Sequence, residues 1–121
     1  MTGWNNETGV KADDGKPPLS LLDRYALEQI AQVLRFGAAK YSADNWRGGI
    51  RHRRLIDAAL RHLMAISDGE DVDPESGLPH AAHLGCCVMF LLWMQKHRPD
   101  LDDRWKLSLP LEVKPKQQNT K

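Results

Sequence analysis

The 121 residues of the chain fit a single domain, and a hydrophobic share of 41% is sufficient for a small core. A formal charge of +1 and a pI near 7.8 provide no electrostatic field that would recruit a nucleic acid or a membrane surface, so we expect neither partner. The longest apolar-rich stretch, residues 84–94, is too short to cross a bilayer, and the N-terminus lacks the pattern of a secretory signal. We therefore expect a cytoplasmic protein.

The N-terminal part predicts a polar arm followed by one long helix. Residues 1–18 contain Gly, Asn, Asp and Pro without apolar periodicity, which is typical of a flexible arm, either a lid over a ligand or a solvated tail. Apolar residues then recur every three or four positions over residues 21–41, and Ser20 is suited to cap that helix. Gly37 lies inside it and indicates either a close approach of another backbone or a ligand, or a glycine that is merely tolerated.

Two further helices are predicted on either side of a short acidic turn. The apolar pattern indicates a helix over residues 51–68, for which Gly69 is a natural stop. A third helix should follow Ser76 or Gly77, with Pro79 in its first turn. It should be the most buried helix, because it is apolar nearly all round from Leu84 onward.

An all-α fold follows, with three main helices in a domain over residues 19–109 and a disordered tail over residues 110–121. The sequence contains no alternation typical of strands and no internal repeat. Three helices are fewer than the four of a common helical bundle. We therefore expect oligomerisation to complete the core of a bundle.

His80 and His83 are the first candidates for metal ligands. They stand three apart at the start of the third helix, so both side chains project from one face and can share an ion. The turn before them adds four carboxylates, from Glu70, Asp71, Asp73 and Glu75. Alternatively, the acids only complement the helix dipole and the histidines are satisfied core residues. Mixed imidazole and carboxylate ligands suit Mn²⁺, Co²⁺ or Zn²⁺ at least as well as Mg²⁺.

Basic and aromatic residues gather beside this candidate metal site. The basic residues are Lys40, Arg47, Arg51, Arg53, Arg54 and Arg61. Trp46, in a turn with Asn45, either stacks on a planar base or plugs the core. Asp57 and Arg61 stand four apart and either belong to the site or form a surface ion pair. Cations beside a metal and an aromatic ring indicate a nucleoside polyphosphate, and phosphate chemistry without a Walker loop must be metal-centred.

Several blocks of the sequence are distinctive when taken in order: Phe36-Gly-Ala-Ala-Lys40-Tyr41, Asn45-Trp46, Asp57-Ala-Ala-Leu-Arg61-His62, Gly69-Glu70-Asp71, Asp73-Pro-Glu75-Ser-Gly-Leu-Pro-His80 and His83. Over residues 14–95 the chain thereby resembles the phage dATP/dGTP diphosphohydrolase family, which is related to the MazG-like all-α nucleoside triphosphate pyrophosphohydrolases. The resemblance implies hydrolysis of a purine deoxynucleoside triphosphate between its α and β phosphates, with a divalent metal and a helical oligomer. The paired glutamate motifs usual in MazG-like enzymes are absent, and His80-Ala-Ala-His83 stands at the position of one of them. This difference leaves the number and identity of the metals open.

We therefore predict a purine nucleoside triphosphate pyrophosphohydrolase of phage nucleotide-pool metabolism, acting in the host cytoplasm as a homodimer or homotetramer. Its predicted residues are the metal ligands Glu70, Asp71, His80 and His83, the catalytic residues Asp57, Glu70 and Arg61, and the substrate-binding residues Lys16, Lys40, Asn45, Trp46 and Arg61. Mg²⁺ or Mn²⁺ is the expected ion, with Co²⁺ and Zn²⁺ as alternatives.

Two other functions remain as alternatives. The first is a catalytically inactive helical module that binds a nucleotide or a partner, since the glutamate pairs are missing. The second is a protein that grips DNA through Arg51, Arg53 and Arg54, which the near-zero net charge argues against.

Overall fold

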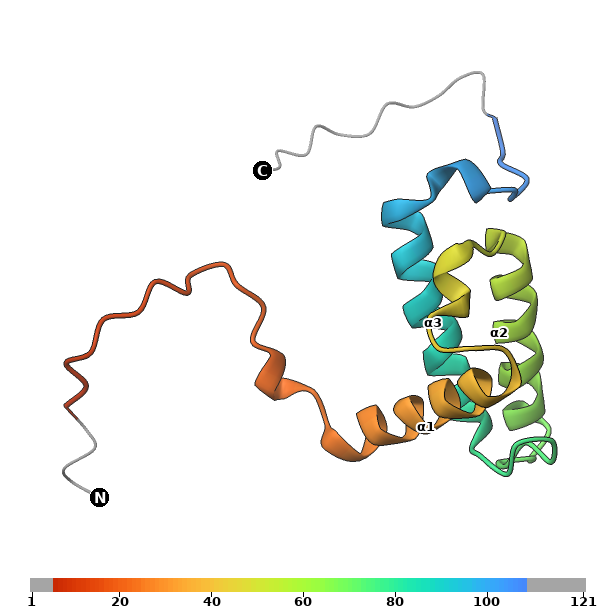
Figure 1. Cartoon of the computed structure of the whole chain (residues 1–121), viewed down its shortest axis with the longest axis horizontal. Coiled ribbons are helices and arrows are strands. Elements are labelled where there is room, and N and C mark those ends of the chain that lie inside the picture. The colour runs from red at the N-terminus through yellow and green to blue at the C-terminus, as the bar shows by residue number, and fades with distance from the viewer. Residues whose placement is uncertain (1–5, 109–121) are drawn as a thin grey trace.

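The protein is an arrangement of three α-helices and three short 3-10 helices, described by a computed structural model over residues 6–108. The elements are η2 (Leu19–Leu21), α1 (Arg24–Lys40), η3 (Asn45–Gly48), α2 (His52–Ser67), α3 (His80–His97) and η4 (Pro99–Leu101). Helices α2 and α3 form an antiparallel hairpin, and α1 crosses α3 near the loop that joins them (Figure 1). The prediction of an all-α fold with three main helices is confirmed. Within the described range, no helix is long and apolar enough to span a membrane.

Helix α1 begins later than predicted because Asp23, and not Ser20, provides its N-cap. The Asp23 carboxylate accepts a hydrogen bond of 2.9 Å from the backbone N–H of Ala26, which satisfies one of the free donors of the first turn. Ser20 lies in the preceding 3-10 turn, η2. Both Ser20 and Asp23 are suited to capping, and the sequence pattern did not separate them.

The N-terminal arm extends away from the helical hairpin (Figure 1). Every residue from 6 to 18 is exposed, and a backbone hydrogen bond of 3.1 Å from Lys16 to Asp13 forms a turn within this segment. The start of the predicted arm, residues 1–5, and the predicted tail over residues 110–121 lie outside the described residues.

Helix α2 is closed at Gly69, as predicted. Gly69 has a φ of 92°, in the left-handed region that glycine adopts without a steric penalty. Its N–H donates to the Ile66 carbonyl and the N–H of Glu70 donates to the Ala65 carbonyl, each at 2.9 Å. These two bonds form a Schellman motif, which ends the helix and turns the chain toward α3.

Helix α3 begins at His80, later than predicted, because the residues before it form a separate turn. The N–H of Asp73 donates to the Leu78 carbonyl at 2.9 Å, and Val72 pairs with Pro79 in an isolated antiparallel bridge. Pro79 is therefore the N-cap and does not lie in the first helical turn. The N–H of His80 donates to the Asp71 carbonyl at 2.9 Å, which anchors the first helical residue to the loop.

The buried core is small and lies mainly where α1 meets α3. Its buried apolar residues are Val33, Leu55, Ala82, Cys86 and Met94. The two helices approach each other closely at Gly85, where a Cβ atom would lie 2.8 Å from Cδ1 of Ile30. A Cβ atom at Gly37 would meet no atom within 4 Å. Gly37 thus makes no close approach to another backbone, and the close approach of α1 to α3 occurs at Gly85. A close approach of a ligand at Gly37, which lines a cavity described below, stays a prediction.

The segment after α3 returns to the start of α2 and caps it. The Asp103 carboxylate accepts a hydrogen bond of 2.9 Å from the backbone N–H of Arg53, in the first turn of α2. The buried His52 ring lies 3.2 Å from the Arg98 carbonyl. The hairpin is therefore held at both ends, by the acidic loop at one and by the residues around η4 at the other.

Candidate metal centre and adjoining cavity

Three potential metal ligands come together between α2 and α3: His62, Asp73 and His80. One ligand atom from each residue lies within 4.8 Å of the others. His62 belongs to α2, Asp73 to the connecting loop and His80 to the first turn of α3. His80 is buried and the other two are half-buried, so the group is largely shielded from solvent. We refer to these three residues as the metal-ligand group.

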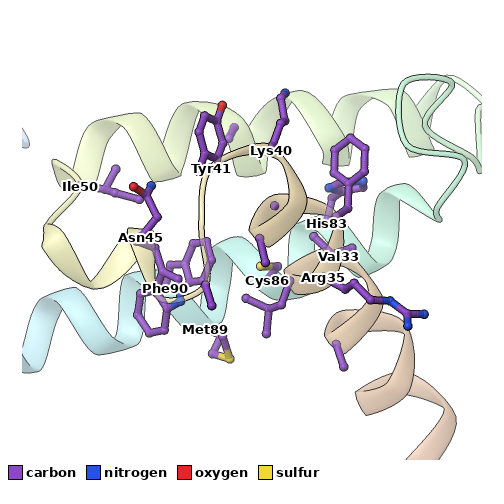
Figure 2. Close-up of a pocket in the computed structure, with 18 of the residues that line it drawn as sticks. Val33, Arg35, Lys40, Tyr41, Asn45, Ile50, His83, Cys86, Met89 and Phe90 are labelled. Carbon is purple, nitrogen blue, oxygen red and sulfur yellow. The ribbon is translucent and has the colours of Figure 1, made fainter.

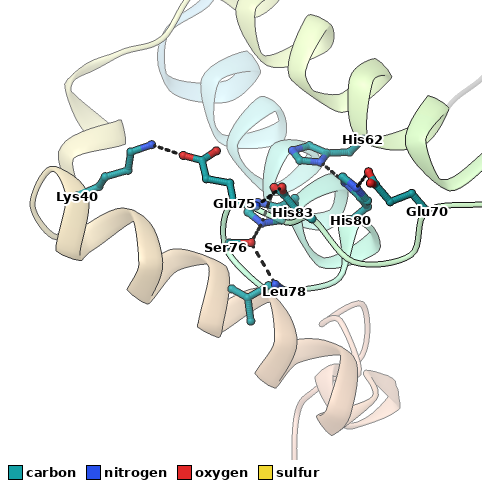
Figure 3. A network of polar contacts seen from close by, with 9 residues as sticks. Lys40, His62, Glu70, Glu75, Ser76, Leu78, His80 and His83 are labelled. Atoms are coloured by element: carbon teal, nitrogen blue, oxygen red, sulfur yellow. Dashed lines mark hydrogen bonds and ion pairs between the residues drawn. The ribbon is translucent and has the colours of Figure 1, made fainter.

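The two imidazoles face each other through the same ring nitrogen. Nδ1 of His62 lies 2.8 Å from Nδ1 of His80, and the opposite nitrogen of His80, Nε2, lies 2.8 Å from Oε1 of Glu70. Figure 3 shows this chain of contacts from Glu70 through His80 to His62. The ring of His83 stacks on that of His62, with centroids 4.7 Å apart and an interplanar angle of 9°. The site therefore contains three neighbouring histidines.

The acidic loop is held in shape by its own side chains. Asp73 Oδ1 accepts a hydrogen bond of 3.0 Å from the N–H of Glu75, and its Oδ2 lies 3.5 Å from Nε2 of His83. The Ser76 hydroxyl accepts a hydrogen bond from the N–H of Leu78 at 3.1 Å and contacts the same His83 nitrogen at 2.7 Å. Asp73 is thus positioned by a local turn before any ligand arrives.

Burial keeps two of the three histidines neutral near neutral pH. Desolvation lowers the pKa of His62, and the nearby His83 and His80 lower it further. Desolvation is also the largest cause that lowers the pKa of His83. A neutral imidazole has a free lone pair, which is the form that binds a metal.

The metal-ligand group fits a divalent ion that accepts nitrogen ligands. Two nitrogens bound to one ion at about 2.0–2.1 Å lie roughly 3 Å apart, and the two Nδ1 atoms are already 2.8 Å apart. The Asp73 carboxylate adds an anionic oxygen, so the donor set is two imidazoles and one carboxylate. That set suits Zn²⁺, Mn²⁺ or Co²⁺, whereas Mg²⁺ prefers oxygen ligands alone.

A cavity of about 1080 Å³ adjoins the metal-ligand group and is lined by all three of its residues. Its volume is similar to that of pockets that bind small organic ligands. Figure 2 shows Lys40 and Tyr41 on one side of the space and Met89 and Phe90 on the other. The charged lining residues are Arg35, Lys40, Asp44, Arg47, Arg61, Asp73 and Glu75. The cavity thus places cationic groups near a candidate metal centre.

Lys40 and Glu75 form an ion pair of 3.0 Å between the end of α1 and the acidic loop. The Glu75 carboxylate, through its hydrogen bond and its charge, raises the pKa of the Lys40 ammonium. Both side chains are exposed, at 46% and 65%. Exposed ion pairs are weak, so a more strongly anionic ligand in the cavity can compete for Lys40.

The predicted metal ligands are only partly grouped by the structure. His80 belongs to the metal-ligand group, and His83 lies directly beside it. Glu70 contacts the nitrogen of His80 that faces away from His62. Asp71 reaches His80 through its backbone carbonyl.

The other predicted site residues are divided between two cavities. Lys40, Asn45, Trp46 and Arg61 line the large cavity. Asp57 lines a smaller one of about 390 Å³, together with Arg61. Lys16 belongs to the projecting arm and lines neither.

The Trp46 ring is surrounded by neighbouring side chains. The ring stacks on Phe90 with centroids 4.5 Å apart at 20°, and the Arg47 guanidinium carbon lies 4.4 Å from the ring centroid. Trp93 meets it edge-on at 5.1 Å. These contacts favour the interpretation of Trp46 as a core plug, while its predicted role in binding a base stays a prediction.

Two members of the metal-ligand group, His62 and Asp73, were not among the predicted ligands. A signal for His62 exists in the helical period: it stands seven residues after Leu55 and four before Ile66, on the apolar stripe of α2. A histidine on such a stripe should face the neighbouring helix. Asp73 was one of four acids in the turn, and only the folded loop distinguishes it from the others.

Comparison with known proteins places this helical chain in a family. Residues 6–104 match the sequence model described as dATP/dGTP diphosphohydrolase, N-terminal. Since the match covers most of the chain, the protein belongs to the dATP/dGTP diphosphohydrolase family, in the region that the family description calls N-terminal. A similar protein from Salmonella phage PMBT28, named dATP/dGTP diphosphohydrolase, is 44% identical over 104 residues, which are 85% of this chain and 36% of the relative. The chain thus spans about a third of that relative's length. No solved structure matches it.

Proposed function

We propose that this protein binds a purine deoxynucleoside triphosphate of the dATP or dGTP type and hydrolyses it to the monophosphate and pyrophosphate. The observation that carries the proposal is the metal-ligand group at the wall of a cavity with cationic lining residues, in a chain of this family. The name of the Salmonella phage relative, which is 44% identical, supports the choice of substrate. We further propose that the reaction takes place in the host cytoplasm, as part of phage nucleotide-pool metabolism.

In the proposed reaction, a water oxygen bonds to the α phosphorus while the bond from that phosphorus to the α–β bridging oxygen breaks. Pyrophosphate leaves, and the water gives up one proton. A divalent ion held by the metal-ligand group would act as a Lewis acid toward the phosphate oxygens. His62, Asp73 and His80 would hold it, and their two imidazoles favour Mn²⁺, Co²⁺ or Zn²⁺ over Mg²⁺.

Lys40 and Arg61 would neutralise the triphosphate charge. Both line the cavity, and Lys40 can exchange its exposed partner Glu75 for a phosphate oxygen. Arg61 takes part in none of the ion pairs found among residues 6–108, so its guanidinium is available for phosphate. The roles of Asp57, Asp71 and Lys16 stay predictions.

A homo-oligomer, a dimer or a tetramer, also stays our proposal. It is supported by large apolar side chains that the hairpin leaves exposed, namely Leu60, Leu63, Met64, Val88 and Leu92. A single chain with so small a buried core benefits from covering them. Light scattering coupled to size-exclusion chromatography measures the subunit number directly, and a monomer at micromolar concentration would contradict the proposal.

The activity is tested by measuring pyrophosphate release from all common nucleoside triphosphates, each with Mg²⁺, Mn²⁺, Co²⁺ or Zn²⁺. We expect release from dATP or dGTP. The rate of release should fall by at least about tenfold in Asp73→Asn, because removing even a residue that only supports a metal ligand usually lowers metal affinity or activity by that factor. Asparagine keeps the acceptor for the Glu75 N–H and removes the charge. Asp68→Asn removes a charge from the exposed end of α2 and should retain activity. Tight nucleotide binding without pyrophosphate release would replace this proposal with the inactive binding module.

A further inference from the structure

We infer that Glu70 is a positioning residue that fixes the ring proton of His80 on Nε2, so that the lone pair of His80 Nδ1 points at His62 within the metal-ligand group. The inference deepens the proposed function and rests on the metal centre described there. It differs from a role for Glu70 as a metal ligand, because its carboxylate would act through the histidine.

The contact between Glu70 and His80 has a defined direction. Oε1 of Glu70 lies 2.8 Å from Nε2 of His80. An ionised carboxylate accepts hydrogen bonds and cannot donate one, so the proton of this bond belongs to Nε2. The His80 side chain is only 8% exposed, whereas Glu70 is 54% exposed. The buried ring thus depends on Glu70 for this hydrogen bond.

The backbone also keeps His80 in place. Its N–H donates to the Asp71 carbonyl at 2.9 Å, and Asp71 directly follows Glu70. The loop therefore holds His80 by two hydrogen bonds, one to its backbone and one to its ring. With the ring held in this way, Nδ1 faces His62 at 2.8 Å, within the metal-ligand group.

This arrangement determines what His62 does in the absence of an ion. A neutral His80 with its proton on Nε2 has only a lone pair at Nδ1, so the short contact requires the Nδ1–H of His62 to donate. Binding of an ion by both Nδ1 atoms requires that proton to leave His62 Nδ1 and a proton to be taken up at His62 Nε2. The number of bound protons does not change in this exchange. His80 thus already has the tautomer that binds the ion, whereas His62 has to change its tautomer.

Other carboxylates near the site do not share this role. Asp73 faces His83, with its Oδ2 3.5 Å from Nε2 of that residue, and Glu75 faces Lys40. Glu70 alone, among the described acids, forms an ion-pair contact with His80. In metalloproteins a carboxylate on the far nitrogen of a ligating histidine typically orients the ring and raises its basicity.

The test reads the histidine tautomers by long-range ¹H–¹⁵N correlation NMR in metal-free protein at neutral pH. We expect the Nε2–H form for His80 in the wild-type chain. Glu70→Ala should lose this preference, whereas Glu70→Gln should keep it, because the amide oxygen can still accept from Nε2–H. Asp68→Asn, which removes a charge from the neighbouring helix end without touching His80, should behave as wild type. Circular dichroism confirms that each variant is folded.

The same four proteins are then titrated with Zn²⁺, Mn²⁺ and Co²⁺ by calorimetry. Glu70→Ala should weaken the tightest of these ions by about tenfold, the lower end of the range for outer partners, because Glu70 is half-exposed. An Nδ1–H or doubly protonated His80 in the wild type, or an unchanged tautomer and affinity in Glu70→Ala, would overturn the inference. A further outcome is that the proteins show the expected tautomers and ion binding that depends on Glu70, yet release no pyrophosphate. This result would support the inference and refute the proposed function.

Discussion

Replacing His62 with alanine should remove about half or more of the thermal stabilisation that we expect a divalent ion to give this protein. In the proposed site the ion would bind the folded chain through His62, Asp73 and His80, which come from two helices and a loop and are not grouped in an unfolded chain. An ion present at a hundred times its dissociation constant stabilises the fold by about 2.7 kcal/mol. For a domain of roughly 100 residues, this corresponds to a rise in the melting temperature of about 10–20 °C.

The substitution removes one of the three ligands in the metal-ligand group. If the affinity falls by about 10- to 100-fold, the same ion concentration stabilises the variant by only about 0.4–1.4 kcal/mol. The assay is thermal unfolding followed by circular dichroism, with chelator and then with Mn²⁺, Co²⁺ or Zn²⁺. His97→Ala is the matched control, because His97 is an exposed histidine at the opposite end of α3. It should retain the full rise.

Two results would refute the reasoning. One is a wild-type melting temperature that no ion raises above its value in chelator. The other is an equal rise in wild type and His62→Ala, which would mean that the stabilising ion binds elsewhere. A lower melting temperature of the variant in chelator is a separate effect of lost packing. Subtracting this value from the melting temperature with the ion isolates the rise that depends on the metal.

The remaining predictions concern the packing of α1 and the effect of pH. Gly37→Ala should stabilise the protein by about 1 kcal/mol, since the new methyl group meets no atom and alanine favours the helix. Gly85→Ala should destabilise it by up to about 2 kcal/mol, since its methyl group meets Ile30. Urea unfolding measures both free energies, and a stabilised Gly85→Ala would contradict the packing of α1 on α3. Burial lowers the pKa values of His62 and His83, so the folded chain binds fewer protons than the unfolded chain as the pH falls. The contribution of these two histidines to stability is therefore complete above about pH 6.5 and is lost as the pH falls toward their folded pKa values. Metal-free melting temperatures should therefore fall below about pH 6.5, with a smaller fall in His62→Ala, and equal falls would count against this origin.

The helices could be predicted from sequence because their signals are local. Apolar periodicity indicated all three, and Gly69 marked the end of α2 through its own backbone preference. The errors in boundaries came from competition between local signals. Asp23 and Ser20 are both good caps, and Pro79 fits an N-cap as well as a first turn.

The site was harder to predict because its members meet only through tertiary packing. His80 stood out by its spacing to His83, yet its neighbour across the hairpin is His62, which the spacing rule could not reveal. Glu70 was expected to bind a metal directly, and its contact with the outer nitrogen of His80 depends on how the loop folds back. Likewise, the close approach at Gly85, which the sequence did not indicate, depends on where α1 crosses α3.

The proximity of the two histidines along the chain has a consequence for folding kinetics. His62 and His80 are only 18 residues apart, and the loop between them is closed by a Schellman motif and a tight turn. Bringing together such close positions costs little loop-closure entropy, and contacts of short sequence separation form quickly. The hairpin of α2 and α3 should therefore assemble early and carry its histidines into contact before α1 docks. An ion available during synthesis could then bind the paired histidines at this stage and help to nucleate the fold.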